Sequence, residues 1–75
     1  MTMELIFYGL KAESTFGKKT PWFLCEVMGD DRWQKEDLWQ IRLFRSEEIA
    51  ERHRKIRQNE MSRDIISIIE IKLTL

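Results

Sequence analysis

The C-terminal stretch is the most apolar part of the chain, and it constrains what all other residues can do. Residues 65–75 read IISIIEIKLTL, and their β-branched and aliphatic side chains favour an extended strand. Alternation along a strand places one set of side chains on each face: Ile69, Ile71, Leu73 and Leu75 on one, and Glu70, Lys72 and Thr74 on the other. Such a strand has to be covered, so we expect the chain to fold around it.

A capped and charged helix is predicted immediately before this strand. Ser46 is a favourable N-cap for a helix over residues 47–59, whose first turn is acidic and whose last turns are basic, as the helix dipole favours. Salt bridges are expected between Glu48 and Arg52 and between Glu51 and Lys55. The apolar stripe is narrow, which suits a helix resting on one face of a sheet, and it comprises Ile49, Ala50, His53 and Ile56.

Three upstream strands complete the predicted sheet. Residues 3–10 carry apolar side chains on both faces, as in a central strand, with Gly9 weakening its end or marking a bulge. A second strand is predicted over residues 22–28, directly after Pro21. Residues 38–45 alternate and predict a third strand, for which a short helix is the alternative.

The connections between these elements set the expected topology. Residues 11–20 are polar and form the first connection, and Gly29-Asp30-Asp31 gives a turn. The charged residues 32–37 that follow are expected to form a loop or a single helical turn. The helix then returns the chain, so that the fourth strand runs parallel to the third and hence to the first. We expect one α+β domain over residues 1–75, with the order β-β-β-α-β. Its mostly antiparallel four-stranded sheet has the order 3-2-1-4, and one helix packs on one face.

Charge and hydropathy exclude several classes of function. Thirteen basic residues balance thirteen acidic ones, and the net charge of zero gives no long-range attraction to nucleic acid or to an anionic membrane. No stretch reaches the length of about 18 apolar residues that a membrane span needs, and the N-terminus lacks a basic leader. We therefore expect a cytoplasmic protein with no membrane partner.

The only cysteine and the only histidine limit the chemistry. One cysteine cannot form an intrachain disulfide, and Cys25 and His53 together cannot supply the four ligands of a structural zinc ion. Cys25 lies within a predicted strand and His53 on the apolar stripe of the helix, which are typical positions of packing residues. We expect no cofactor, no metal and no enzymatic activity.

A tryptophan among carboxylates is the strongest indication of a binding site. Trp33 lies in a charged segment, and an exposed tryptophan near arginines is typical of protein-interface hot spots. The acidic cluster lacks a metal-binding spacing and suits a partner with a basic surface. The predicted partner-binding residues are Trp33, Asp30, Asp31, Glu36 and Asp37.

Single-stranded nucleic acid is the alternative partner. Basic residues are frequent between residues 39 and 57, and tryptophans interleaved with cations are typical of surfaces that bind single strands. Salt bridges within the helix account for many of these charges without any ligand. The residues of this alternative site are Trp39, Arg42, Arg52 and Lys55.

The sheet itself offers a further surface for a partner. A single helix cannot cover both faces of four strands, so we expect an uncovered apolar face that includes Ile6, Tyr8, Phe23, Val27, Ile66 and Ile68. This face, or the edge of the third strand, could join two copies of the chain in a homodimer. In size and layout alone, the chain resembles small phage and mobile-element proteins that bind and inhibit a larger protein. A protein-binding module, such as an inhibitor or adaptor, is therefore the expected function.

Overall fold

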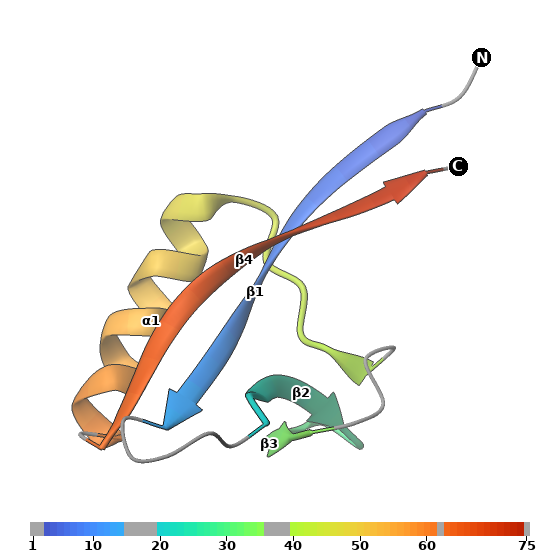
Figure 1. Cartoon of the computed structure of the whole chain (residues 1–75). Coiled ribbons are helices and arrows are strands. Elements are labelled where there is room, and N and C mark those ends of the chain that lie inside the picture. The colour runs from blue at the N-terminus through green and yellow to red at the C-terminus, as the bar shows by residue number, and fades with distance from the viewer. Residues whose placement is uncertain (1–2, 15–19, 36–39, 62, 75) are drawn as a thin grey trace.

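The fold is a four-stranded antiparallel sheet with one helix on one of its faces (Figure 1). A computed structural model describes residues 3–14, 20–35, 40–61 and 63–74. The elements are β1 (Glu4–Ser14), β2 (Trp22–Val27), β3 (Asp30–Gln34), α1 (Glu47–Glu60) and β4 (Asp64–Thr74). The sheet order is β3-β2-β1-β4, so the predicted α+β class and strand order are confirmed.

Strands β1 and β4 form one long antiparallel ribbon. Their register is unbroken from the pair Glu4 and Thr74 to the pair Ser14 and Asp64. We call Leu10–Ser14 with Asp64–Ile68 the inner half of this ribbon, and Glu4–Phe7 with Ile71–Thr74 the outer half. Figure 1 shows α1 beside the inner half, while the outer half extends away from the other elements. The molecule is accordingly elongated and measures 45 × 25 × 24 Å.

Strand β1 is longer than its sequence pattern predicted. The residues Lys11 to Ser14, expected in a connecting loop, continue the strand because Lys11 and Ala12 pair with β2 and Ala12 is fully buried. Gly9 consequently lies in the middle of β1 rather than at its end, and the unbroken pairing leaves no bulge there. Gly17, expected at the tightest point of the connection, lies outside the described residues.

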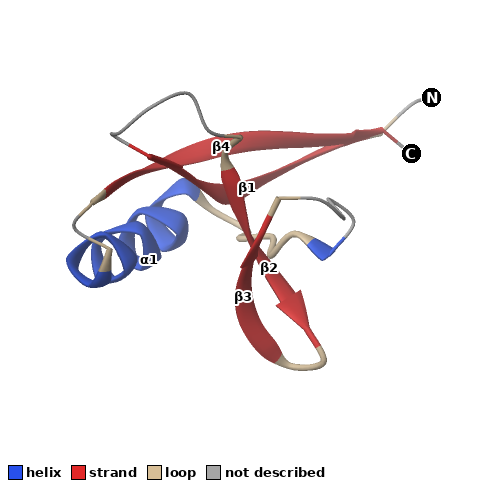
Figure 2. Cartoon of the chain, turned by 60° about the horizontal axis from the view of Figure 1, so that its bottom comes forward, coloured by secondary structure: helices blue, strands red, loops and turns tan. Residues whose placement is uncertain are grey.

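The hairpin of β2 and β3 corrects the predicted position of the third strand. Its turn is formed by Met28 and Gly29, both with positive φ (52° and 84°), as in the two-residue turns that match strand twist. The turn was predicted at residues 29–31 and lies at residues 28 and 29. Residues 30–34, which were expected in the turn and the following segment, form β3. Figure 2 shows this hairpin projecting from the β1–β4 ribbon. The sequence pattern did not reveal this strand because its side chains are mostly charged. Charged side chains are common in a strand that, like β3, lies at the edge of a sheet.

A strand was predicted over residues 38–45, of which 38 and 39 lie outside the described residues, and segment 40–45 is irregular in the structure. It forms two isolated bridges, between Ile41 and Cys25 of β2 and between Phe44 and Tyr8 of β1. The backbone N–H of Arg42 donates to the carbonyl of Leu24 at 2.9 Å. The segment thus bonds to both β1 and β2 beyond the point where their mutual pairing ends. It brings Phe44, which is buried, into the core.

The direction of β4 differs from the prediction for a simple topological reason. The pairing of segment 40–45 with Tyr8 is antiparallel, and β4 also runs antiparallel to β1. Segment 40–45 and β4 therefore run in the same direction, as expected for elements joined by a returning helix. The unpredicted strand β3 added one reversal of the chain, so β4 meets β1 antiparallel instead of parallel.

The helix confirms its predicted cap, but only Ala50 and His53 of the predicted apolar stripe face the core. The backbone N–H of Ile49 donates to the Ser46 hydroxyl at 3.2 Å, and Ala50 is the buried residue of α1. Ile49 and Ile56 of the predicted apolar stripe are exposed. Ala50 is the residue that α1 contributes to the core cluster. The core cluster consists of Leu10, Ala12, Leu24, Phe44, Ala50 and Ile66.

Candidate docking surface on the apolar sheet face

The predicted acidic site is only partly assembled in the structure. Trp33 lies in β3, where it is half-buried and packs against the core cluster. Asp30 is exposed beside the hairpin turn, whereas Asp31 is half-buried. Glu36 and Asp37 lie outside the described residues. Trp33 therefore contributes to packing, and it is not the fully exposed anchor that the hot-spot pattern indicated.

Asp31 is the centre of an ionic network. Arg42 donates from Nη1 to both of its carboxylate oxygens at 2.6 Å, and Arg57 donates from Nη2 to Oδ2 at 2.8 Å. The Asp31 side chain is 19% exposed, so these bonds are more protected from water than a surface salt bridge. The network joins β3, segment 40–45 and α1. The Asp31 carboxylate, which a basic partner would recognise, is therefore already paired with Arg42 and Arg57.

The alternative nucleic-acid residues do not form one free cationic surface. Arg42 is occupied by Asp31, and Arg52 faces solvent near Glu48, with 3.8 Å between Nη2 and Oε1. This second contact confirms one of the two predicted helix salt bridges. The other differs, because Glu51 accepts from Arg54 Nε at 2.8 Å, three residues away, instead of pairing with Lys55. Lys55 is exposed and Trp39 lies outside the described residues.

Cys25 and His53 occupy packing positions. The Cys25 thiol is fully buried and donates to the carbonyl of Phe23 at 3.5 Å. His53 packs against Phe44 with 4.7 Å between ring centroids. Burial, aided by Arg42 and Arg57, lowers the pKa of His53, with Asp31 opposing this effect. Among the described residues, no group of three His, Cys, Asp or Glu side chains could hold a metal ion.

The face of the β1–β4 ribbon opposite α1 carries an apolar surface. Leu10, Ala12 and Ile66 pack on the helix side, so residues of the other parity point away from α1. We call this surface the apolar face, and between residues 5 and 9 of β1 and 69 and 73 of β4 it consists of Leu5, Phe7, Gly9, Ile69, Ile71 and Leu73. Leu5 and Leu73 are directly paired and are 37% and 41% exposed.

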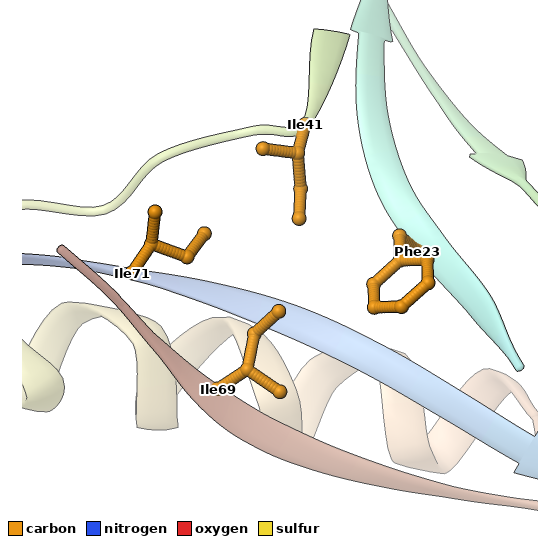
Figure 3. A pocket seen from close by; sticks show the side chains of 4 residues that line it. All are labelled: Phe23, Ile41, Ile69 and Ile71. Carbon is orange, nitrogen blue, oxygen red and sulfur yellow. The ribbon is translucent and has the colours of Figure 1, made fainter. Parts of the chain in front are cut away.

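A pocket lies at the inner end of the apolar face. It has a volume of about 180 Å³ and is lined by Phe23 of β2, Ile41, and Ile69 and Ile71 of β4. Figure 3 shows the four side chains around a common space, with β1 and α1 behind them. The pocket is therefore on the side of the ribbon away from the helix, and it continues the apolar face.

Gly9 allows Ile41 to approach the ribbon closely enough to form this pocket. A Cβ atom at Gly9 would lie 3.1 Å from Ile71 Cδ1, 3.2 Å from Ile41 Cδ1 and 3.4 Å from Ile69 Cγ1. The first two distances are shorter than ordinary carbon contacts, so a side chain here would shift the δ-methyl groups of Ile71 and Ile41 by a few tenths of an ångström. The glycine thus leaves room for the close approach of these pocket-lining side chains.

The two faces of the outer half differ in polarity. On the apolar face, the described strand residues between 5 and 9 and between 69 and 73 carry no charge. The helix side of the same strands presents the pairs Glu4 with Thr74, Ile6 with Lys72 and Tyr8 with Glu70. A contiguous apolar surface bordered by polar residues is typical of a binding site.

Sequence reasoning assigned the uncovered face only partly. It included Phe23, which does line the pocket, but it also included Tyr8, Ile66 and Ile68, which pack on the helix side. The error arose because the pattern ended the first strand at Leu10. The buried Ala12, two residues further, identifies the parity that faces the helix. The predicted separation of Ile69, Ile71 and Leu73 from Glu70, Lys72 and Thr74 is correct.

Comparisons with known proteins leave the site to be interpreted from its own geometry. No protein-family model matches the chain, and neither a curated protein nor a solved structure matches it. Within the described residues, α1 falls short of the length and apolar character that crossing a membrane requires.

Proposed function

We propose that this protein is a non-enzymatic protein-binding module, of the inhibitor or adaptor kind, which docks through its apolar face. The observation that carries this proposal is the continuity between the exposed pair Leu5 and Leu73 and the pocket beside Ile69 and Ile71. Apolar area of this kind costs free energy in water, at roughly 25 cal/mol per Å², and a partner that covers it recovers that free energy.

The size of the pocket favours a side chain as its occupant. Sites for small-molecule ligands usually enclose about 300–1,000 Å³. The pocket of about 180 Å³ is smaller than this. It is similar to cavities of about 150 Å³ that accept a single benzene molecule. One aromatic or aliphatic side chain of a protein partner fits this volume, with the outer half of the ribbon supporting the rest of the partner.

A matched pair of neighbouring substitutions tests the proposal. Leu5 and Ile6 are adjacent and similarly exposed, but they point to opposite faces of the outer half. We expect Leu5→Ser to abolish capture of a specific protein from lysate of the natural host, and Ile6→Ser to leave it intact. The readout is quantitative mass spectrometry after a high-salt wash, with wild type and both variants immobilised at equal density.

The same experiment distinguishes the apolar face from the acidic site and from the nucleic-acid site. Asp30→Lys reverses the exposed carboxylate of the acidic cluster without disturbing the Asp31 network, so loss of capture by this variant alone would favour the acidic site. Recovery of nucleic acid that disappears as salt rises would favour Arg52 and Lys55. Equal capture by wild type and Leu5→Ser would overturn docking through the apolar face.

A further inference from the structure

Strand β4 leaves one edge of the sheet without a strand partner in the described part of the chain. It is the last strand in the order β3-β2-β1-β4 and pairs with β1 along its other edge. Strands with exposed edges of this length usually pair with another chain or carry a device that prevents it. Along this edge, the backbone N–H and C=O groups of alternate β4 residues point away from β1, and we call them the outward groups.

The hydrogen bonds of β1 identify the outward groups. Tyr8 exchanges both of its backbone hydrogen bonds with Phe44, at 2.9 and 2.7 Å, on the side of β1 opposite β4. Its partner Glu70 therefore belongs to a non-hydrogen-bonded pair, and the N–H and C=O of Glu70 point to the outer edge. The same holds for the residues at even spacing from it, Asp64, Ile66, Ile68, Lys72 and Thr74.

Gln58 of α1 occupies the inner end of this edge. Its side-chain oxygen accepts from the Ile66 N–H at 2.9 Å, and its side-chain nitrogen donates to the Asp64 carbonyl at 2.6 Å. These are the two bonds that a neighbouring strand would make, so the amide closes the edge at Asp64 and Ile66. Among the described residues of β4, the edge stays open to a strand from Ile68 to Thr74, and the midpoint of that window is Ile71.

We infer that a second copy of the chain pairs with this window, β4 against β4, antiparallel about a two-fold axis at Ile71. This register aligns outward groups with outward groups, placing Ile68 opposite Thr74 and Glu70 opposite Lys72 of the other copy. Each facing pair then exchanges two backbone hydrogen bonds. The inference concerns the strand edge and is independent of the apolar face proposed above.

Charge complementarity selects this register over its neighbours. Glu70 and Lys72 are both about half exposed on the helix side of the strand, and within one chain their charged atoms are 3.9 Å apart. Centring the pair on Ile71 sets each glutamate opposite a lysine. Centring it on residue 70 or 72 sets like charges opposite each other, which is destabilising. The register at Ile71 also uses the whole open window.

The resulting dimer is a continuous sheet in which the two outer halves lie side by side. A two-fold axis perpendicular to the sheet keeps both apolar faces on the same side. Ile69 of one copy then lies opposite Leu73 of the other, next to the pocket lined by Ile69 and Ile71. The helices stay apart, because α1 lies beside the inner half and the pairing uses the outer end of β4.

Charge reversal and charge exchange test the register. The oligomeric state of the full chain is measured by sedimentation equilibrium from low to high micromolar concentration. Glu70→Lys or Lys72→Glu creates two like-charge pairs by symmetry and should weaken the dimer about tenfold. The double variant Glu70→Lys/Lys72→Glu restores unlike pairs and should return to within about threefold of wild type. Glu4→Lys, with the same change in net charge on β1, should leave the dimer unchanged.

A cross-link provides a second readout that does not depend on affinity. At the two-fold axis, the Cα atoms of facing residues in a non-hydrogen-bonded pair lie about 4.5 Å apart, within disulfide range. Ile71→Cys should therefore form a disulfide-linked dimer on mild oxidation, while Leu73→Cys, displaced from the axis, should not. Circular dichroism confirms that each variant is folded. A wild-type monomer at the highest concentration, a double variant as weak as the single ones, or equal cross-linking at both positions would overturn the inference.

Discussion

The two halves of the β1–β4 ribbon have one register but very different surroundings. In the inner half, Leu10 is fully buried between the sheet and α1. In the outer half, Leu5 of the same strand is 37% exposed on the opposite face. Figure 2 shows the outer half of the ribbon extending beyond α1 and the β2–β3 hairpin. The same residue type is thus buried in the core at one position of β1 and exposed to solvent at another. Pairing in a strand therefore does not determine what its side chains contribute.

The difference assigns separate roles to the two halves. The inner half contacts α1 and the hairpin and contributes Leu10, Ala12 and Ile66 to the core cluster, so we expect it to contribute more to stability than the outer half. The outer half is held mainly by its own cross-strand pairs, and two strands alone are marginally stable in water. A chain of this size would gain little from extending the ribbon unless the extension were used. We interpret the outer half as a recognition element mounted on a stable base.

Substitution of one leucine in each half gives the largest expected contrast. Leu10→Ala removes fully buried volume and should destabilise the fold by about 2–5 kcal/mol. Leu5→Ala removes half-exposed volume in the outer half and should cost less than about 1 kcal/mol. Because domains of this size are stable by only about 5 kcal/mol, Leu10→Ala should be partly unfolded without denaturant. Urea denaturation followed by circular dichroism measures both, and equal costs would contradict the division into two halves.

The ionic network that joins β3, segment 40–45 and α1 should contribute less to stability than the apolar core. Asp31→Asn keeps the shape of the side chain but leaves Arg42 and Arg57 without their carboxylate. We expect a loss of about 2 kcal/mol, discounted from the value for a fully buried pair because all three side chains are partly exposed. The control is Asp30→Asn at the exposed neighbour, expected within about 0.5 kcal/mol of wild type. A similar stability for both variants would show that the network is a surface feature only.

Sequence reasoning located the elements that depend on local patterns. The Ser46 cap, the charge order of α1 and the alternation of residues 69–74 are local, and each is found in the structure. The order of the first three strands followed from a general preference for adjacent antiparallel neighbours, whereas the fourth was placed correctly beside the first but in the wrong, parallel direction. These features required no knowledge of which distant residues meet.

Features that depend on distant contacts were predicted poorly. Strand β3 reads DDRWQ, and its charged composition resembled a loop because the partners of Asp31 lie 11 and 26 residues away. Segment 40–45 alternates like a strand, yet it is held by single bridges to Tyr8 and Cys25. The pocket could not be predicted either, because it needs Gly9 and Ile41 to approach across the fold.

The amide of Gln58 offers a smaller test at the inner end of the ribbon. Gln58→Ala removes the bonds to Asp64 and Ile66, and the Ile66 N–H belongs to a residue that is 2% exposed. We expect a cost of about 1 kcal/mol in denaturation experiments. Asn59→Ala, at the exposed next position of α1, is the control and should change stability by less than about 0.5 kcal/mol. An equal effect of both substitutions would indicate that only helix propensity is being measured.

The smallest expected effect is a pH dependence of the stability of the fold that arises from His53 of α1. Burial, together with Arg42 and Arg57, lowers the pKa of the folded-state imidazole below its ordinary value of 6.5. Above that value the imidazole is neutral in both states and its full contribution to stability is present. As the pH falls below it, the unfolded chain takes up the proton first, so stability decreases until the folded-state pKa is passed.

Replacement by phenylalanine isolates this contribution. His53→Phe retains a ring beside Phe44, where the centroids are 4.7 Å apart, and removes the titration. Between about pH 7.5 and about pH 5.5, the wild-type Tm should fall more than that of His53→Phe. Arg54 lowers the pKa of Glu51 below its ordinary value of 4.5, so the loss of that contribution lies at lower pH and does not interfere. If the Tm of both proteins fell equally, the imidazole would not be packed in the folded state. Its contact with Phe44 would then contribute little to the stability of the fold.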